Sequence, residues 1–306
     1  MTSAARLVLV LLLLLVLPPS SPSLRADPST PAPVPAPVPS PLDSALALFN
    51  AHRVPEAREQ FAALAAREPK NVRALWYLGR CELLMQHRQS AVDTLAKAAE
   101  LAPANAAIVA DYGSASLLRA SELGTTFSAI GYARRGRTAL EQAVTLAPDI
   151  IAYREGLVQF YTRAPGFVGG DFDRAYAHIA EIAKRDPARG AVLRANVLCS
   201  EKRYDEALAA CDAFLHDHPD TYLALYTIGR IVSETGRDIA RGETALRRCL
   251  EIPARPEEPD HAGARYRLGL IAEKDNRPAD ARREYQAALA LEPSLEKAAE
   301  ALARLK

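Results

Sequence analysis

The side chains best suited to chemistry lie together in the stretch LHDHPD at 215–220. His216, Asp217 and His218 carry the imidazole and carboxylate groups that bind metal ions. A metal-dependent enzyme built on these residues is therefore the remote interpretation of the sequence. The stretch also falls where a helix is expected to end, and a histidine there interacts favourably with the helix dipole. We accordingly expect no metal site.

Other catalytic patterns are absent from the sequence. The chain contains no HExxH zinc motif, no GxSxG nucleophile turn and no GxGxxG dinucleotide loop. The stretch PGFVGGD at 165–171 is rich in glycine, but it lacks the Gly-Lys-Ser/Thr ending of a phosphate-binding loop. We therefore expect a non-enzymatic protein without a cofactor.

The composition excludes one class of partner and favours one class of fold. The chain has 306 residues and a formal net charge of +1, so it lacks the excess of cations that binds nucleic acid. Only 6% of the residues are aromatic, and most of the chain uses strong helix formers. The sequence predicts a largely helical protein with no nucleic-acid partner.

The N-terminus is typical of a targeting segment. Arg6 precedes the apolar run LVLVLLLLLVL at 7–17, which is too short to span a bilayer but has the length of a signal-peptide core. We expect a signal peptide over 1–26, export to the periplasm or cell envelope, and no integral membrane span after cleavage. An uncleaved anchor is the alternative. Alternating proline and small residues predict a linker over 27–41.

The rest of the chain repeats with a period of 34 residues. Adding 34 to the positions of Ala57, Phe61, Leu64 and Pro69 gives Ala91, Leu95, Ala98 and Pro103. Gly79 and Gly113 are separated by the same interval. This period is that of a helix–turn–helix unit that buries its apolar face only by stacking on its neighbours.

These positions resemble the tetratricopeptide repeat family, and the chain as a whole looks like an exported bacterial member. The last copy is the cleanest, with Leu268, Gly269, Ala281, Tyr285, Ala288 and Pro293. The resemblance implies an all-α fold, a right-handed α-solenoid of about seven units over 42–293. A capping helix is expected over 294–306, with Ser294 as its N-cap. The units are expected to end near Pro69, Pro103, Pro148, Pro187, Pro219, Pro253 and Pro293.

Two units are longer than the period. The extra residues fall in 119–136 of unit three and 164–173 of unit four, and we expect both stretches to form inserted turns between helices. Asp171 or Asp173 can cap the following helix, and the glycines allow positive φ. Equivalent turns of adjacent units lie side by side, so we expect the two to touch. They serve either as a packing device or as a binding edge, with a small aromatic cluster of Phe127, Tyr132, Phe167 and Phe172.

The family resemblance also implies a partner-binding groove lined by the first helix of each unit. The matching positions are Arg73, Trp76, Arg80, Glu155, Gln159, Arg189, Asn196, Tyr226, Arg230 and Tyr266. Aromatic residues and arginine are enriched at binding hot spots, and the set indicates an extended peptide with acidic or carboxylate groups. The alternative is that Trp76 is buried between units and the arginines are solvated.

We therefore expect a non-enzymatic scaffold that binds an unidentified protein or extended peptide. An accessory subunit of an envelope or export assembly is the alternative. The four cysteines leave a further choice open. Cys199 and Cys211 could form a disulfide, whereas the family pattern places Cys211 and Cys249 at packing positions.

Overall fold

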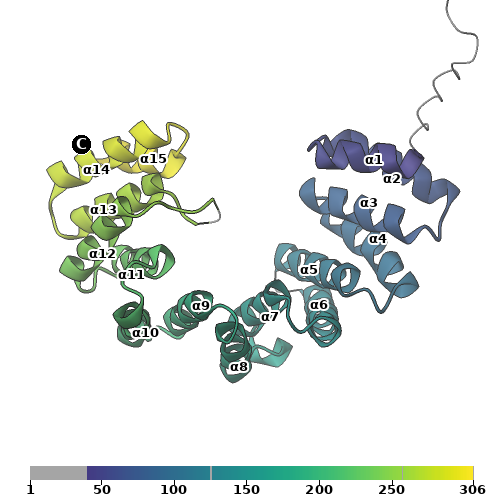
Figure 1. Ribbon diagram of the computed structural model, residues 1–306, viewed down its shortest axis with the longest axis horizontal. Helices are drawn as coiled ribbons and strands as arrows, with labels where there is room; N and C mark the ends of the chain where they lie inside the picture. Colours follow the sequence, from purple (N-terminus) through teal and green to yellow (C-terminus); the bar gives the residue numbers. More distant parts are fainter. Residues whose placement is uncertain (1–39, 125, 257, 306) are drawn as a thin grey trace, which may run out of the picture. The chain divides into compact units, whose positions relative to one another are not determined.

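The structure is a computed structural model that describes residues 40–124, 126–256 and 258–305. Within these ranges the chain forms α-helices and no β-strand, and the helices follow one another in sequence order (Figure 1). They make seven helical pairs and a final single helix, which confirms the predicted all-α repeat fold. The pairs are α1 (Pro41–Asn50) with α2 (Val54–Arg67), α3 (Val72–Leu84) with α4 (Arg88–Leu101), α5 (Ala106–Leu123) with α6 (Phe127–Leu146), α7 (Ile151–Arg163) with α8 (Phe172–Ala183), α9 (Pro187–Ser200) with α10 (Tyr204–Asp217), α11 (Tyr222–Thr235) with α12 (Ile239–Glu251), and α13 (His261–Lys274) with α14 (Pro278–Leu291).

The beginning of the described chain overlaps the end of the expected linker. Helix α1 starts at Pro41, and the Ser40 hydroxyl accepts a hydrogen bond from the Asp43 amide at 3.1 Å. The predicted signal peptide over 1–26 and the expected linker up to residue 39 lie outside the described residues. No helix in the described part of the chain is long and apolar enough to cross a membrane.

The regular units are held together by a large side chain that fills the hollow above a glycine. A Cβ atom added to Gly79 would lie 2.5 Å from Leu95, and one added to Gly229 would lie 2.2 Å from Leu246. At Gly269 the neighbour is Tyr285, at 2.3 Å. Because such distances are far below van der Waals contact, only glycine lets the two helices of each unit approach this closely.

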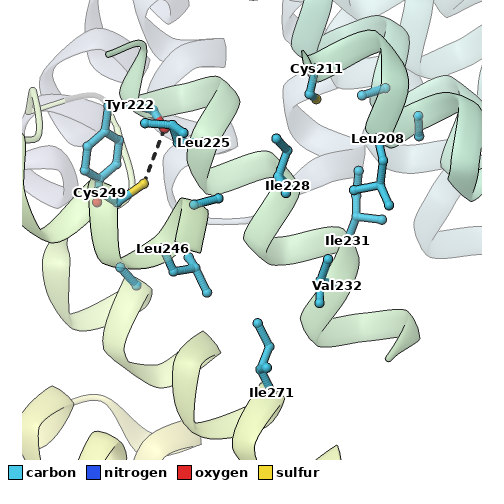
Figure 2. Close-up of a cluster of buried hydrophobic side chains, with 14 of the residues drawn as sticks. Leu208, Cys211, Tyr222, Leu225, Ile228, Ile231, Val232, Leu246, Cys249 and Ile271 are labelled. Carbon is cyan, nitrogen blue, oxygen red and sulfur yellow. Dashed lines mark hydrogen bonds between the residues drawn. The ribbon is translucent and has the colours of Figure 1, made fainter. Parts of the chain in front are cut away.

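The largest buried cluster joins the units from α9 to α13. Leu208, Ile228, Ile231 and Leu246 belong to this cluster and are at most 2% exposed. In Figure 2, Leu208 of α10 lies beside Ile231 of α11. Cys249 belongs to this cluster, and its thiol donates to the Tyr222 carbonyl at 3.7 Å.

The cysteines act as packing residues in the structure. All four are thiols, and Cys81, Cys211 and Cys249 are buried. Burial raises the pKa of Cys211 and of Cys249 to about 12, so both thiols are protonated at neutral pH. The structure therefore favours the packing interpretation over a disulfide between Cys199 and Cys211.

The final helix differs in its cap from the sequence prediction. Helix α15 runs over Glu296–Arg304 with Leu295 at the N-cap position, so the prediction of Ser294 as N-cap is wrong. The Ser294 hydroxyl instead contacts Glu292 in the preceding turn, at 3.4 Å. Ala298 and Ala301 are buried on the face of α15 that covers the last unit.

Unit three contains the larger correction. The stretch 119–136 is not an inserted turn, because α5 continues to Leu123 and α6 begins at Phe127. Helix α5 has 18 residues and α6 has 20, whereas α3 and α4 of unit two have 13 and 14. The extra residues therefore lengthen both helices of the pair. They do so because the segments on either side of Gly124 are rich in helix formers, and Thr126 caps α6 by accepting from the Ala129 amide at 3.2 Å.

Unit four does contain a turn at the expected place. Helix α7 ends at Arg163, a short 3₁₀-helix η1 (Gly166–Val168) follows, and α8 begins at Phe172. Gly169 has a φ of 117°, a conformation that glycine adopts without strain. Asp171 is confirmed as the cap of α8, since its carboxylate accepts from the Arg174 amide at 3.1 Å.

Candidate functional site

A cavity of about 540 Å³ lies where the two lengthened units meet. Its inner wall is apolar and buried. The wall is formed by Ala129 and Leu140 of α6, Phe160 of α7 and Val168 of η1. Leu117, Ile130 and Ala133 complete the wall on the side of unit three. A cavity of this size and character is typical of a site that receives an apolar group.

The cavity exists because of the two departures from the regular repeat. Helices α5 and α6 extend roughly one turn beyond the helices of a regular unit. The turn of unit four meets this extension, because the Arg134 guanidinium donates to the Phe167 carbonyl at 3.4 Å. The two stretches therefore touch, as their positions in the sequence predict, and they enclose the space between them.

A close helix contact stabilises the extended pair. A Cβ atom added to Gly113 of α5 would lie 3.0 Å from the Gly136 carbonyl of α6. One added to Gly136 would lie 2.7 Å from Leu117. The two glycines thus bring α5 and α6 together and direct Leu117 toward the cavity.

The opening of the cavity is polar and carries positive charge. Ser114 and Ser121 of α5 and Gln159 and Arg163 of α7 line it, and all four are exposed. Among the described residues, Arg163 has neither an ion pair nor a hydrogen-bonding partner. The cavity therefore combines an apolar interior with an available guanidinium at its edge.

Exposed apolar side chains surround the opening. Leu118 and Phe167 line it and are 46% and 73% exposed, respectively. Phe127, at the first position of α6, is 94% exposed but is not among the residues that line the cavity. Solvent-exposed apolar residues that gather in one region mark a surface for interaction.

The four aromatic residues predicted for the inserted edge do not form one cluster. Tyr132 turns toward unit two, where its hydroxyl donates to Gln89 at 2.9 Å and the Arg135 guanidinium lies 4.4 Å from its ring. Phe127 and Tyr132 are five residues apart on a helix, so they lie on different faces. Phe172 is at the surface at the start of α8, and only Phe167 of the four lines the cavity.

The residues predicted for the groove do lie on the first helices, but several of them bridge consecutive units. The Trp76 indole donates to Asp111 of α5 at 2.7 Å, and Arg80 lies 3.7 Å from the same carboxylate. Burial is the main reason that the pKa of Asp111 is raised. Arg230 donates to Asn196 of α9 at 2.5 Å.

The same pairing continues along the other first helices. Arg189 of α9 forms an ion pair with Glu155 of α7. The Tyr226 hydroxyl accepts from Arg267 of α13 at 2.9 Å, and Tyr266 packs against Tyr285. Arg73 is exposed, and Gln159 lines the cavity. Most of the predicted groove side chains thus use their polar groups to join one unit to the next.

The histidine stretch does not assemble a metal site in the described residues. The His216 ring contacts Asp217 at 3.1 Å, whereas the His218 ring lies against Phe214 with centroids 4.8 Å apart. No group of three or more potential metal ligands gathers anywhere in 40–124, 126–256 or 258–305.

Sequence reasoning missed the residues that shape the cavity. Leu117, Ile130, Ala133 and Arg163 were not singled out, although they come from the lengthened units. The segment 106–146 contains many helix formers, but four glycines also interrupt it, at 113, 124, 131 and 136, so its composition alone does not indicate two long helices. Reading that segment as two long helices would have placed Leu117 and Ile130 on facing surfaces.

Comparison with known proteins identifies the repeat. The family profile described as tetratricopeptide repeat matches residues 42–106, 167–222 and 226–296, which together exceed half of the chain. The search of curated proteins found no match. A tetratricopeptide repeat protein from Parabacteroides merdae has a solved structure with a TM-score of 0.60 and 16% identity, covering 87% of this chain and 96% of that one.

A second solved structure has the same architecture. It is the C-terminal part of a tetratricopeptide repeat-containing protein from Cytophaga hutchinsonii, with a TM-score of 0.51 and 15% identity, covering 85% of this chain and 99% of that one. At these identities the two structures support the fold alone. The family profile, the repeated glycine–large residue packing and the seven helical pairs agree, and the chain belongs to the tetratricopeptide repeat family.

Proposed function

We propose that the protein is an exported, non-catalytic scaffold that binds a segment of a partner protein in the cavity between units three and four. Repeats of this family build extended surfaces for protein partners. The observation that carries the proposal is the cavity of about 540 Å³, which has a buried apolar wall and exposed Leu118 and Phe167 at its opening.

The cavity is better suited to a partner than the face of the first helices. On that face, Trp76, Arg230 and Tyr226 already hydrogen-bond to residues of neighbouring units. A partner would have to replace those bonds, and leaving a half-buried polar group without its partner costs free energy. The apolar wall of the cavity, by contrast, gains free energy whenever an apolar side chain displaces water from it.

Export is the part of the proposal that rests on the sequence. Arg6 and the apolar run at 7–17 have the pattern of a signal peptide, and the expected mature protein is in the periplasm or cell envelope. Fractionation of the native host, with N-terminal sequencing of the recovered protein, tests this directly. A protein that is recovered in the cytoplasm with residues 1–26 intact would contradict export.

A pair of matched substitutions tests the binding site. Ala133→Phe places a ring in the cavity, whereas Ala180→Phe makes the same change at an exposed position of α8 that does not line it. We expect Ala133→Phe to abolish co-purification of the partner from the native host and Ala180→Phe to preserve it. Circular dichroism would verify that both variants keep their helical content.

Photo-crosslinking distinguishes the two candidate surfaces. One probe replaces Phe167 at the cavity, and the other replaces Arg73, which is exposed on the first helices. We expect the partner to be captured from the probe at residue 167. Capture from the probe at residue 73 alone would place the partner on the first-helix groove and contradict the cavity as the site.

A further inference from the structure

We infer that the segment received by the cavity is acidic and carries one large apolar side chain, which enters the cavity while a neighbouring carboxylate pairs with Arg163. This inference rests on the proposed function and specifies the chemistry of the partner. Three features of the described residues support it: the character of the cavity wall, the charge around the opening, and the apolar surface outside it.

The wall determines the first requirement. Leu140, Phe160 and Val168 are 2%, 5% and 8% exposed and offer no polar atom of their side chains to a ligand. A charged or amide group placed against them would lose its hydration without finding a partner. A volume of about 540 Å³ accommodates an aromatic or long aliphatic side chain and the backbone around it.

The charge around the opening determines the second requirement. Arg163 is the one charged residue among the described residues that line the cavity, and Arg134 reaches the edge of the cavity at the Phe167 carbonyl. These two cations repel a basic ligand and attract an acidic one, and this complementarity selects the partner.

Arg163 is the cation best placed to pair with that carboxylate. It lines the opening four residues after Gln159, so both lie on the same side of α7. Arg134 is engaged with the Phe167 carbonyl, and Arg135 lies over the Tyr132 ring. The Arg163 guanidinium has no partner in the described part of the chain, and its planar group matches a carboxylate in geometry.

The apolar surface outside the cavity favours a peptide over a lipid. Leu118 and Phe167 line the opening and are 46% and 73% exposed, so the apolar surface continues beyond the buried wall. A protein segment covers both areas at once, with an apolar centre and a polar rim. A fatty acid would place its chain against the buried wall and leave the exposed part of Phe167 in water.

Selection from a random peptide library tests the inference. The full chain, immobilised, is panned against displayed peptides of twelve residues, and the enriched sequences are read. We expect an aspartate or glutamate beside a large apolar residue. Enrichment of basic or uncharged sequences, or no enrichment, would overturn the inference.

A charge exchange provides the sharper measurement. Arg163→Glu is expected to weaken binding of the enriched fluorescent peptide by at least about tenfold. Replacing the peptide's acidic residue by lysine is expected to restore part of that loss on the same variant. The matched control is Arg67→Glu, because Arg67 is also an exposed arginine in the last turn of a helix, α2, and does not line the cavity.

The outcomes separate this inference from the proposed function. If Ala133→Phe abolishes partner binding while Arg163→Glu and Arg67→Glu behave alike, the cavity is the site but the acidic chemistry is wrong. If palmitate displaces the peptide and also binds Arg163→Glu weakly, the cavity receives an acyl chain and the inference of a peptide is overturned. If Ala133→Phe leaves the native partner bound, the proposed function itself fails.

Discussion

Unit six and unit three use the same kind of packing position in different ways. In unit six the hollow above Gly229 is filled by Leu246, which is fully buried. In unit three the equivalent glycine, Gly113, meets both Leu140 and the backbone of Gly136, each 3.0 Å from an added Cβ, and Leu117 beside this contact borders the cavity. Both units therefore place a large buried side chain over the glycine, and the lengthened unit adds a second close contact, between Gly136 and Leu117, beside the cavity.

This difference indicates where a repeat protein can acquire a site. The contact between the two helices of a regular unit has no room for a ligand, because the large side chain already fills the space above the glycine. Longer helices add surface beyond that contact without disturbing it, and the added surface encloses the cavity. The fold is thus preserved by the interlocking residues while the extension acquires a separate role.

The largest expected effect comes from removing the large side chain that fills the contact between the two helices of a regular unit. Leu246→Ala should lower the free energy of unfolding by about 2–5 kcal/mol, because a fully buried leucine is replaced by a cavity. Leu117→Ala should cost less than half as much, since Leu117 is half-buried and already borders open space. Urea denaturation followed by circular dichroism compares the two. Equal losses would show that unit three is sealed as tightly as unit six.

An intermediate effect is expected in the turn of unit four. A Cβ atom added to Gly170 would lie 1.7 Å from the Ala164 carbonyl oxygen, and this backbone atom cannot move aside without displacing the turn. Gly170→Ala should therefore cost roughly 1–3 kcal/mol and weaken peptide binding at the cavity. Gly166→Ala is the matched control, because nothing lies within 4 Å of its added Cβ.

Hydrogen exchange and peptide binding measure that pair of variants. Gly166→Ala should change the free energy of unfolding by at most about 0.5 kcal/mol and leave amide protection in the turn unaltered. Gly170→Ala should increase exchange at the Asp171 amide, which donates to the Tyr161 carbonyl at 2.8 Å. Normal protection and binding in Gly170→Ala would show that the turn does not shape the cavity.

The smallest expected effect concerns a buried carboxyl group in unit two. Glu82 is 4% exposed, lies 3.7 Å from Arg58, and has one carboxylate oxygen without a hydrogen-bonding partner. Burial raises the pKa of Glu82 above its usual value of 4.5. The folded protein therefore holds this proton more tightly than the unfolded chain does, and stability falls as the pH rises from 4.5 through the folded pKa.

Glu82→Gln removes this titration while keeping the shape of the side chain. We expect the variant to lose stability less steeply than the wild type between pH 4.5 and neutral, with a difference on the order of 1 kcal/mol. Urea midpoints measured across this range provide the comparison. Parallel pH profiles would contradict a raised pKa of Glu82 in the folded protein.

The repeat could be predicted from sequence because it depends on residue size at fixed intervals. Gly269, Tyr285 and Ala288 recur in the order that two interlocking helices require, and Asp171 has the side chain that a helix start requires. These features act through local geometry and nearest-neighbour packing, so a linear pattern contains them.

The cavity could not be predicted in the same way. Whether the residues around Gly124 turn or continue as helices depends on the contact between Gly113 and Gly136, which no local pattern shows. The groove prediction had a different weakness. Glu155 and Arg189 are 34 residues apart, and the same interval that marks the repeat also places opposite charges side by side. Residues chosen as ligand contacts were thus partners of each other.

The order of the helix contacts has a consequence for how the chain is made. Most contacts join helices that are adjacent, or next but one, in the sequence, so each unit needs only its neighbours to bury its apolar face. Unit one can therefore pack against unit two while later units are still being synthesised, and folding advances along the chain. The lengthened pair α5–α6 requires more of the chain than a regular pair does, because its 38 residues of helix must form before the two helices can pack together.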